Sequence, residues 1–302
     1  MNKYSIVFGP ADVSHNMEDM QVLVKRHLCV AKRFNEVAEY SGISVNALLK
    51  KEETPSSVSN FQLSSLGLMA GMLGIADYIK STHGAPESVG GVSLGELVAL
   101  CFSSAISLKD TISIILNGEE KPHDRRNEPE GVGFVFIPNE VEHFASDIER
   151  INVAVDYGQI QGGIGRLVML SGLRKDLEKA AQESLLDIDV LPEELCNTAY
   201  HSPLRGAASL KISSLLEGME LNRCDYPVNT CFKDLKRLSE AEDVKSAITK
   251  NDIETLYLDE LLEQQKQDKL DNVVCIGPFL RSLELNFFLP TEYFDQSWVE
   301  NN

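Results

Sequence analysis

The sequence predicts an α/β protein in which a small ferredoxin-like unit is inserted into a larger, α/β-hydrolase-like unit. Three observations predict this class. Strand and helix signals alternate along most of the 302 residues, and the order of these signals changes between Gly131 and Leu191. A glycine-flanked serine, Ser93, lies where a short strand signal turns into a helical one. A chain of this length can bury a substantial core.

The first part of the chain reads as strand, helix, helix, strand and helix. Tyr4–Phe8 is a short apolar strand that ends at the turn signal Gly9-Pro10. Helical spacing of apolar residues predicts one helix over 20–39 and another over 61–80. Ser88 and Val89 are a weak strand signal, and the residues after Ser93 recur on one face of a helix.

The middle of the chain has a β-α-β-β-α-β order, which is the ferredoxin-like split motif. Strands are expected over 133–137, 151–155, 166–170 and 188–191, and helices over 140–148 and 173–184. The polar run 117–131 is expected to be the linker into this unit. We therefore expect residues 129–198 to form the small unit, and residues 1–128 and 199–302 to form the large one. A helix over 253–265 and a buried strand over 272–276 should complete the large unit.

Composition limits the class of function. A net charge of −18 argues against nucleic acid or an anionic membrane as the main partner, because both repel such a surface. The six cysteines are scattered and contain no C-x-x-C pair, so we expect reduced thiols, a cytoplasmic protein and no metal site. The start lacks the features of a signal peptide, and no apolar run is long enough to span a bilayer.

Gly91-Val92-Ser93-Leu94-Gly95 fits the nucleophile-elbow pattern G-x-S-x-G. In such a turn the serine has a strained backbone, and side chains at the two flanking positions would clash. The turn exposes the serine Oγ, and the following amide, that of Leu94, is free to bind an oxyanion. The alternative is a glycine-rich start of a helix in which Ser93 is only the N-cap.

A nucleophilic serine needs a base, and the chain has six histidines. His201 is the best candidate because it lies in the loop Tyr200-His-Ser-Pro-Leu204, where the chain leaves the small unit. The alternative for a lone histidine is a hydrogen-bonded core residue.

Three segments, GVSLGELVAL, AYHSPL and VVCIGPFLRSL, resemble malonyl-CoA:acyl-carrier-protein transacylases and the acyltransferase domains of polyketide synthases in order and spacing. The likeness covers essentially the whole chain. It implies that Ser93 attacks an acyl thioester of coenzyme A or phosphopantetheine with His201 as base, and that no cofactor is bound. It also implies an oxyanion hole from the Leu94 and Ala11 amides, and a backbone carbonyl near residues 256–258 that orients His201.

Departures from this family point to a different acyl group. Malonyl-using members have an arginine on the helix after the elbow, which pairs with the malonyl carboxylate. Here that position falls at Asn117 or Gly118, so malonyl is a poor substrate on this reading. Three further substitutions relative to the family, Val92, Arg205 and Tyr257, suggest an altered acyl pocket.

The resemblance therefore implies a discrete acyltransferase for an acyl carrier protein, in polyketide, antibiotic or related secondary metabolism. The donor would be a coenzyme A or carrier-protein thioester. Two alternatives stay open: a hydrolase that clears acyl groups from carrier proteins, and a non-catalytic docking protein. Carrier-protein docking would need a basic cluster, and the sequence offers Arg125 with Arg126, Arg205, or the group Lys233, Lys236 and Arg237.

Overall fold

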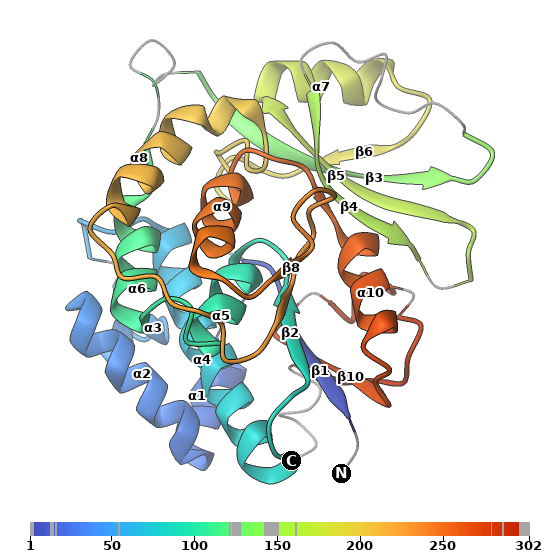
Figure 1. Ribbon diagram of the computed structural model, residues 1–302. Helices are drawn as coiled ribbons and strands as arrows, with labels where there is room; N and C mark the ends of the chain where they lie inside the picture. The colour runs from blue at the N-terminus through green and yellow to red at the C-terminus, as the bar shows by residue number, and fades with distance from the viewer. Residues whose placement is uncertain are drawn as a thin grey trace.

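The computed structural model describes residues 3–12, 15, 17–53, 55–120, 122, 128–141, 151–160, 162–278, 280–285 and 287–295. Two sheets organise these residues, and the predicted fold class is confirmed: a larger α/β unit carries a smaller α/β unit (Figure 1). Figure 1 shows the small sheet and its helix α7 lying across one end of the large unit.

The large sheet has six strands in the order β11-β10-β1-β2-β7-β8. All of its neighbouring strands run parallel except the antiparallel pair β7 and β8. The strands are β1 (Tyr4–Phe8), β2 (Ser88–Gly91), β7 (Val228–Asn229), β8 (Arg237–Leu238), β10 (Asn272–Ile276) and β11 (Thr291–Phe294). The central strands β1 and β2 are buried along their whole length, as expected for parallel strands with helices on both faces.

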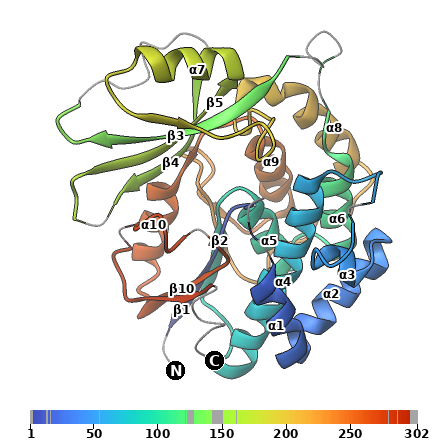
Figure 2. The same cartoon turned by 180° about the vertical axis from the view of Figure 1, so that it is seen from behind.

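The helices of the large unit pack around this sheet, with α4 and α5 on one side and α10 on the other (Figures 1 and 2). They are α1 (Glu18–Arg26), α2 (Leu28–Ser41), α3 (Val45–Leu48), α4 (Asn60–His83), α5 (Leu94–Phe102), α6 (Leu108–Asn117), α8 (Gly206–Leu216), α9 (Ala241–Asn251) and α10 (Leu258–Gln267), with a short 3₁₀ turn at Pro203–Arg205.

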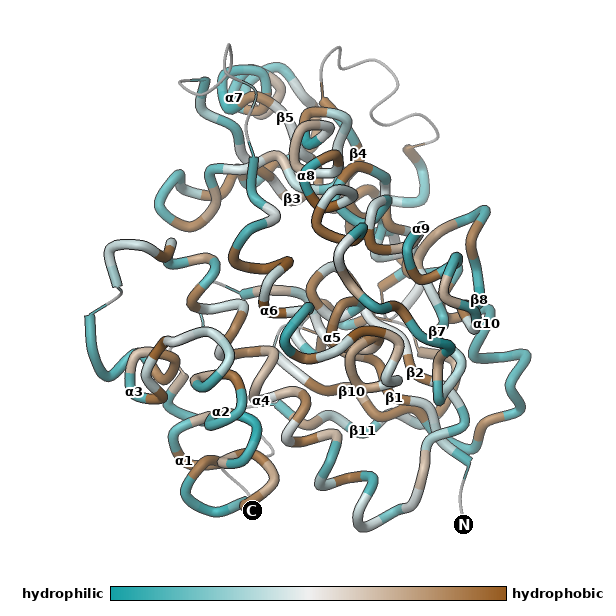
Figure 3. The backbone as a smooth tube through the Cα atoms, turned by 60° about the vertical axis from the view of Figure 1, so that its left-hand side comes forward, coloured by the Kyte–Doolittle hydropathy of each residue, from teal (hydrophilic) through white to brown (hydrophobic). Residues whose placement is uncertain are grey.

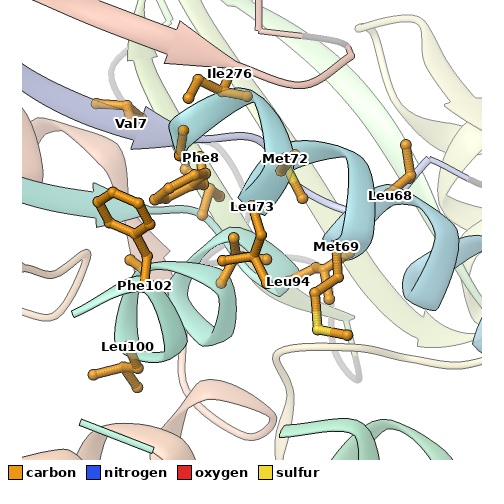
Figure 4. Close-up of a cluster of buried hydrophobic side chains, with 14 of the residues drawn as sticks. Val7, Phe8, Leu68, Met69, Met72, Leu73, Leu94, Leu100, Phe102 and Ile276 are labelled. Carbon is orange, nitrogen blue, oxygen red and sulfur yellow. The ribbon is translucent and has the colours of Figure 1, made fainter. Parts of the chain in front are cut away.

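The core of the large unit lies between β1 and the helices α4 and α5 (Figure 4). Phe8 on β1 packs edge to face against Phe102 on α5, with ring centroids 5.9 Å apart. Leu73 and Met69 of α4 fill the space beside Leu94. Hydrophobic stretches accordingly gather in the interior of this unit, whereas α7 at the edge is largely hydrophilic (Figure 3).

The small unit contains β3 (Glu130–Pro138), β4 (Ile151–Gln159), β5 (Gly165–Leu173), α7 (Arg174–Glu183) and β6 (Ile188–Val190). Its sheet has the order β6-β3-β5-β4-β9, and the first four strands follow the ferredoxin-like arrangement that the sequence predicts. The helix expected over 140–148 lies almost entirely outside the described residues. The unit boundaries 129–198 remain a prediction.

The fifth strand of the small sheet was not expected. It is β9 (Leu256–Tyr257), which pairs in parallel with β4 although it belongs to the C-terminal part of the chain. The predicted helix over 253–265 is therefore wrong in its first five residues, and α10 begins only at Leu258. Main-chain pairing with β4, and a bond from the Tyr257 amide to the Cys231 carbonyl, outweigh the local helical spacing.

The single helix predicted over 20–39 is also wrong, because it is two helices. His27 has an extended backbone (φ −121°, ψ 113°) that separates α1 from α2. Its ring packs edge to face on Tyr78 of α4, with centroids 4.9 Å apart. After this break the chain continues as α2, which packs along α4.

Candidate functional site

Ser93 lies at the sharp turn between β2 and α5. Its backbone angles, φ 58° and ψ −115°, are unusual for a residue with a side chain. A Cβ on Gly91 would lie 2.2 Å from the Gly95 carbonyl oxygen, and one on Gly95 would lie 2.1 Å from the Phe8 carbonyl oxygen. Both flanking positions therefore require glycine, for the steric reason that the G-x-S-x-G pattern suggests.

The Ser93 side chain does not cap α5, although the residue occupies the N-cap position. Its Oγ lies instead 2.9 Å from Nε2 of His201, which is 108 positions later in the chain. The structure thus brings together the two residues that the sequence singled out.

His201 is held from its other ring nitrogen. Nδ1 lies 2.5 Å from the carbonyl oxygen of Asn251, and because a carbonyl can only accept, Nδ1 carries the proton. Nε2 of the neutral ring is then an acceptor, and the Ser93 hydroxyl donates to it. Burial lowers the pKa of His201 to about 4, although the Asn251 hydrogen bond opposes this, so the ring is neutral near pH 7.

The carbonyl that orients His201 is not in the loop 256–258, as the family resemblance implied. It belongs to Asn251, the last residue of α9. The expectation fails because residues 256–257 form β9, whose main-chain groups pair with β4. No sequence signal marked Asn251, since every residue has a carbonyl and only the fold decides which one faces the imidazole.

Glu96 lies in the first turn of α5 and is a second buried group near Asn251. It is 1% exposed, and burial raises the pKa of its carboxyl to about 8. Its carboxyl is therefore largely protonated at neutral pH. A neutral acid here leaves the positive end of α5 free to act on a ligand at Ser93.

Leu94 and Ala11, the two residues expected to form an oxyanion hole, both lie near Ser93. Leu94 is the first residue of α5, where the N–H groups have no partner within the helix. Ala11, in the loop after β1, lines a cavity that also contains Ser93 and His201. The structure therefore places both predicted oxyanion-hole residues at the site.

Two cavities meet at Ser93 and His201. The first, here named the inner chamber, lies within the large unit and has an apolar wall formed by Leu97, Ile114, Ile115, Ile212 and Ile248. The second, the seam cavity, lies between the units and is lined by small-sheet residues that include Val132, Phe134, Val155 and Met169.

An aromatic pair stands where the inner chamber and the seam cavity meet. Phe61 on α4 and Tyr200 stack with centroids 4.8 Å apart, and both residues line both cavities. Ser93 and His201 also line both. A group bonded to Ser93 Oγ could therefore extend to either side of the aromatic pair.

Arg205 lines the inner chamber, as expected for a pocket residue, but its charge is already paired. The guanidinium is 2% exposed and lies 3.0 Å from Asp252 and 2.9 Å from Glu119. Burial raises the pKa of Asp252, and the Arg205 charge opposes that rise. No other Lys or Arg is among the described residues that line this chamber.

Gly118 lines the inner chamber, whereas Asn117 does not. The Asn117 amide bonds back to the Ser113 carbonyl at 3.1 Å on the exposed side of α6. A Cβ on Gly118 would lie 2.6 Å from the Ile114 carbonyl oxygen and 3.0 Å from Cγ1 of Ile212. Ile212 therefore occupies the space that a longer side chain at position 118 would enter.

The other two expected pocket residues lie elsewhere. Val92 is fully buried in the core and lines neither cavity. Tyr257 lines a separate groove on the outer side of His201, and Lys233 Nζ lies 3.7 Å from its ring centroid. Neither residue therefore lines the inner chamber or the seam cavity.

The basic clusters considered for carrier-protein docking differ in accessibility. Arg125 and Arg126 lie outside the described residues, and Arg205 is buried. Lys236 pairs with Glu260 at 3.0 Å, and Arg237 pairs with Asp268.

The described residues contain no group of three or more His, Cys, Asp or Glu side chains arranged to hold a metal ion. No described helix is long and apolar enough to cross a membrane. All six cysteines are free.

No family model and no curated protein matches the sequence. Solved structures do match in fold. A malonyl-transacylase of a type II polyketide synthase, solved in complex with its acyl-carrier protein, is 20% identical with a TM-score of 0.80, over 99% of this chain and 100% of that one. The malonyl CoA-acyl carrier protein transacylase of Coxiella burnetii is 15% identical with a TM-score of 0.81, over 99% and 96%.

A third similar structure is the acyltransferase domain from the second module of the salinomycin polyketide synthase. It is 18% identical with a TM-score of 0.73, over 92% of this chain and 64% of that one. The fold shared with these acyltransferases agrees with the family resemblance seen in the sequence. At these identities the likeness establishes the fold alone.

Proposed function

We propose that this chain is an acyltransferase that moves an acyl group from a thioester onto Ser93 and then to the thiol of an acyl carrier protein. The observation that carries the proposal is the hydrogen bond between Ser93 Oγ and His201 Nε2, at the point where two cavities meet. The fold shared with acyl-carrier-protein transacylases supports it. The donor is an acyl thioester of coenzyme A or of a carrier-protein phosphopantetheine.

In the first half-reaction Ser93 Oγ attacks the thioester carbonyl carbon as its proton passes to His201 Nε2. The resulting imidazolium keeps its Nδ1–H bond to the Asn251 carbonyl, which stabilises the charged ring. The Leu94 and Ala11 amides bind the negative oxygen of the tetrahedral intermediate. Collapse breaks the carbon–sulfur bond, and the leaving thiolate takes the proton from His201.

In the second half-reaction the acceptor thiol gives its proton to His201 and attacks the acyl-serine carbonyl. The ester bond then breaks, and Ser93 Oγ recovers the proton. The two cavities suit this sequence because the acyl group can stay on one side of the Phe61–Tyr200 pair while donor and acceptor thiols exchange on the other. We assign the inner chamber to the acyl group and the seam cavity to the thiol arm.

The acyl group is one without a free carboxylate. Arg205, the cation among the described residues of the inner chamber, is already bound by two carboxylates. Gly118 offers no charge, and Ile212 fills the adjacent space. A buried carboxylate without a partner costs several kcal/mol, so a malonyl group binds poorly. The reaction class fits polyketide or related secondary metabolism, including antibiotic biosynthesis, in the cytoplasm.

The experiment that tests this function is mass spectrometry of the intact protein after incubation with neutral acyl thioesters. Wild type gains the acyl mass on the peptide that contains Ser93. Ser93→Ala loses this adduct and slows transfer to a carrier protein by at least about 1,000-fold. Ser104→Ala is the matched control, because Ser104 also has a positive φ (61°) but its side chain donates to surface Asp225.

Two other results would contradict the proposal. An adduct that persists in Ser93→Ala would exclude Ser93 as the nucleophile. Release of free acid at the same rate with and without an acceptor carrier protein would identify a hydrolase instead.

A further inference from the structure

Ser65 has a buried hydroxyl that no part of the proposed mechanism uses. It lies on α4 one turn after Phe61, is 2% exposed and lines the inner chamber. Its Oγ has no hydrogen-bond partner among the described residues. A buried hydroxyl without a partner is unfavourable, because it loses its bonds to water on folding. A ligand in the chamber could supply the missing bond.

The rest of the described chamber lining does not bond to the Ser65 hydroxyl. One part of the wall is aliphatic and includes Ile114 and Ile115 on α6 and Ile212 on α8. The ionic groups at the other end satisfy one another, because Arg205 binds both Asp252 and Glu119. The chamber therefore combines an apolar wall, a closed ion cluster and one unpaired, uncharged hydroxyl.

We propose that Ser65 determines specificity for an apolar acyl chain that carries a hydroxyl substituent. This inference rests on the proposed function and names the substrate class of the same site. The Ser65 hydroxyl both donates and accepts, so it matches a hydroxyl on the acyl chain. A site built to hydrogen-bond a substrate hydroxyl discriminates against the analogue that lacks it, because its own polar group is then left unpaired.

Ser64 provides a matched control within the same helix turn. It is also 2% exposed, and its Oγ also lacks a partner among the described residues, but it is not part of the chamber lining. Replacing either serine by alanine removes the same atoms from the same helix. Only Ser65→Ala should change substrate choice.

The test measures Ser93 acylation rates with N-acetylcysteamine thioesters of butanoyl and of the 2-, 3- and 4-hydroxybutanoyl isomers. Wild type should prefer one hydroxylated isomer over butanoyl by about ten-fold. Ser65→Ala should reduce that preference below about two-fold by slowing the hydroxylated substrate, and Ser64→Ala should keep it. Equal preference in wild type and Ser65→Ala, or equal loss in both variants, would overturn the inference.

Failure of the proposed function gives a different result. If no thioester acylates Ser93, the acyltransferase proposal fails, and calorimetric binding of the same thioesters to Ser93→Ala still tests Ser65. A binding preference for one hydroxylated isomer that Ser65→Ala removes supports the Ser65 assignment. The absence of any such preference contradicts it.

Discussion

The imidazole of His201 is neutral near pH 7 because of its surroundings. It is 3% exposed in a folded chain, and burial lowers its pKa to about 4. The Asn251 carbonyl fixes the proton on Nδ1, so the ring needs no carboxylate to hold its tautomer. The base should therefore be ready for proton transfer well below neutral pH.

The pH dependence of acylation follows from that pKa. Single-turnover acylation of Ser93 should be constant between about pH 6 and 8, and should fall as His201 becomes protonated near pH 4. Rapid-quench mass spectrometry over pH 3.5–8, with folding checked at each pH by circular dichroism, measures this profile. A midpoint near 6.5, the ordinary value for histidine, would contradict the lowered pKa of the buried ring, and a profile with no fall down to pH 3.5 would contradict His201 as the base.

At the residue scale, sequence reasoning identified side chains better than backbone groups. Ser93 and His201 each stood in a motif with a physical reason, and the fold brings them together. Asn251 contacts His201 through its backbone carbonyl, and because every residue has one, the residue type does not predict this contact. Tyr257 was placed in the acyl pocket by its position in the chain, but β9 turns it into a groove outside His201.

The junction of β2 and α5 sets the site at the element scale. Its geometry depends on contacts between backbones, since the Gly95 position lies against the carbonyl of Phe8 on β1. The strand, the turn and the helix therefore fix one another. Any side chain at position 95 must displace β1, the central strand of the large sheet.

Gly95→Ala should destabilise the protein by about 3 kcal/mol or prevent folding, because its Cβ would lie 2.1 Å from a backbone oxygen. Urea unfolding monitored by circular dichroism measures the change. Gly206→Ala is the control, because nothing lies within 4 Å of a Cβ at the start of α8. The control should be neutral or more stable by about 0.4–1 kcal/mol. Equal stabilities for the two variants would contradict the steric argument.

Local patterns predicted most elements but not where tertiary contacts override them. The strand at 4–8 and the strand at 272–276 match the structure residue for residue. The break at His27 depends on Tyr78, which is 51 positions away, and β9 depends on a partner strand in the other unit. The spacing of apolar residues alone therefore predicts neither the break at His27 nor the strand β9.

Two buried titratable groups make the stability of the whole molecule depend on pH. The pKa of His201 in the folded state is below its ordinary value. The unfolded chain therefore binds a proton that the folded chain does not, and the free energy of unfolding falls as pH drops below about 6.5. Glu96 has a folded pKa of about 8, above its ordinary 4.5, so the folded state holds an extra proton between those values. Its contribution to stability is therefore lost as pH rises through this window.

Between about pH 6.5 and 8, His201 is neutral in both the folded and the unfolded state, so of these two groups only Glu96 changes the free energy of unfolding. The free energy of unfolding of wild type should fall across this range. Glu96→Gln keeps the shape of the protonated acid and cannot ionise, so its stability should stay flat there and exceed that of wild type at pH 8. Thermal unfolding at half-unit pH steps provides the comparison. Parallel curves for the two proteins would show that Glu96 is not protonated in the folded state.

The strand β9 has a consequence for how this protein could be recombined. Its two residues come from beyond the inserted segment, yet they complete the sheet of that segment beside Val155 and Asp156. This strand therefore joins the two units, because a segment of the C-terminal part of the chain belongs to the small sheet. A chimera that exchanged only the inserted segment with a protein of the same fold would remove the strand that pairs with the edge of β4. A chimera in which residues 129–198 are exchanged should fold only when Leu256–Tyr257 are exchanged together with them.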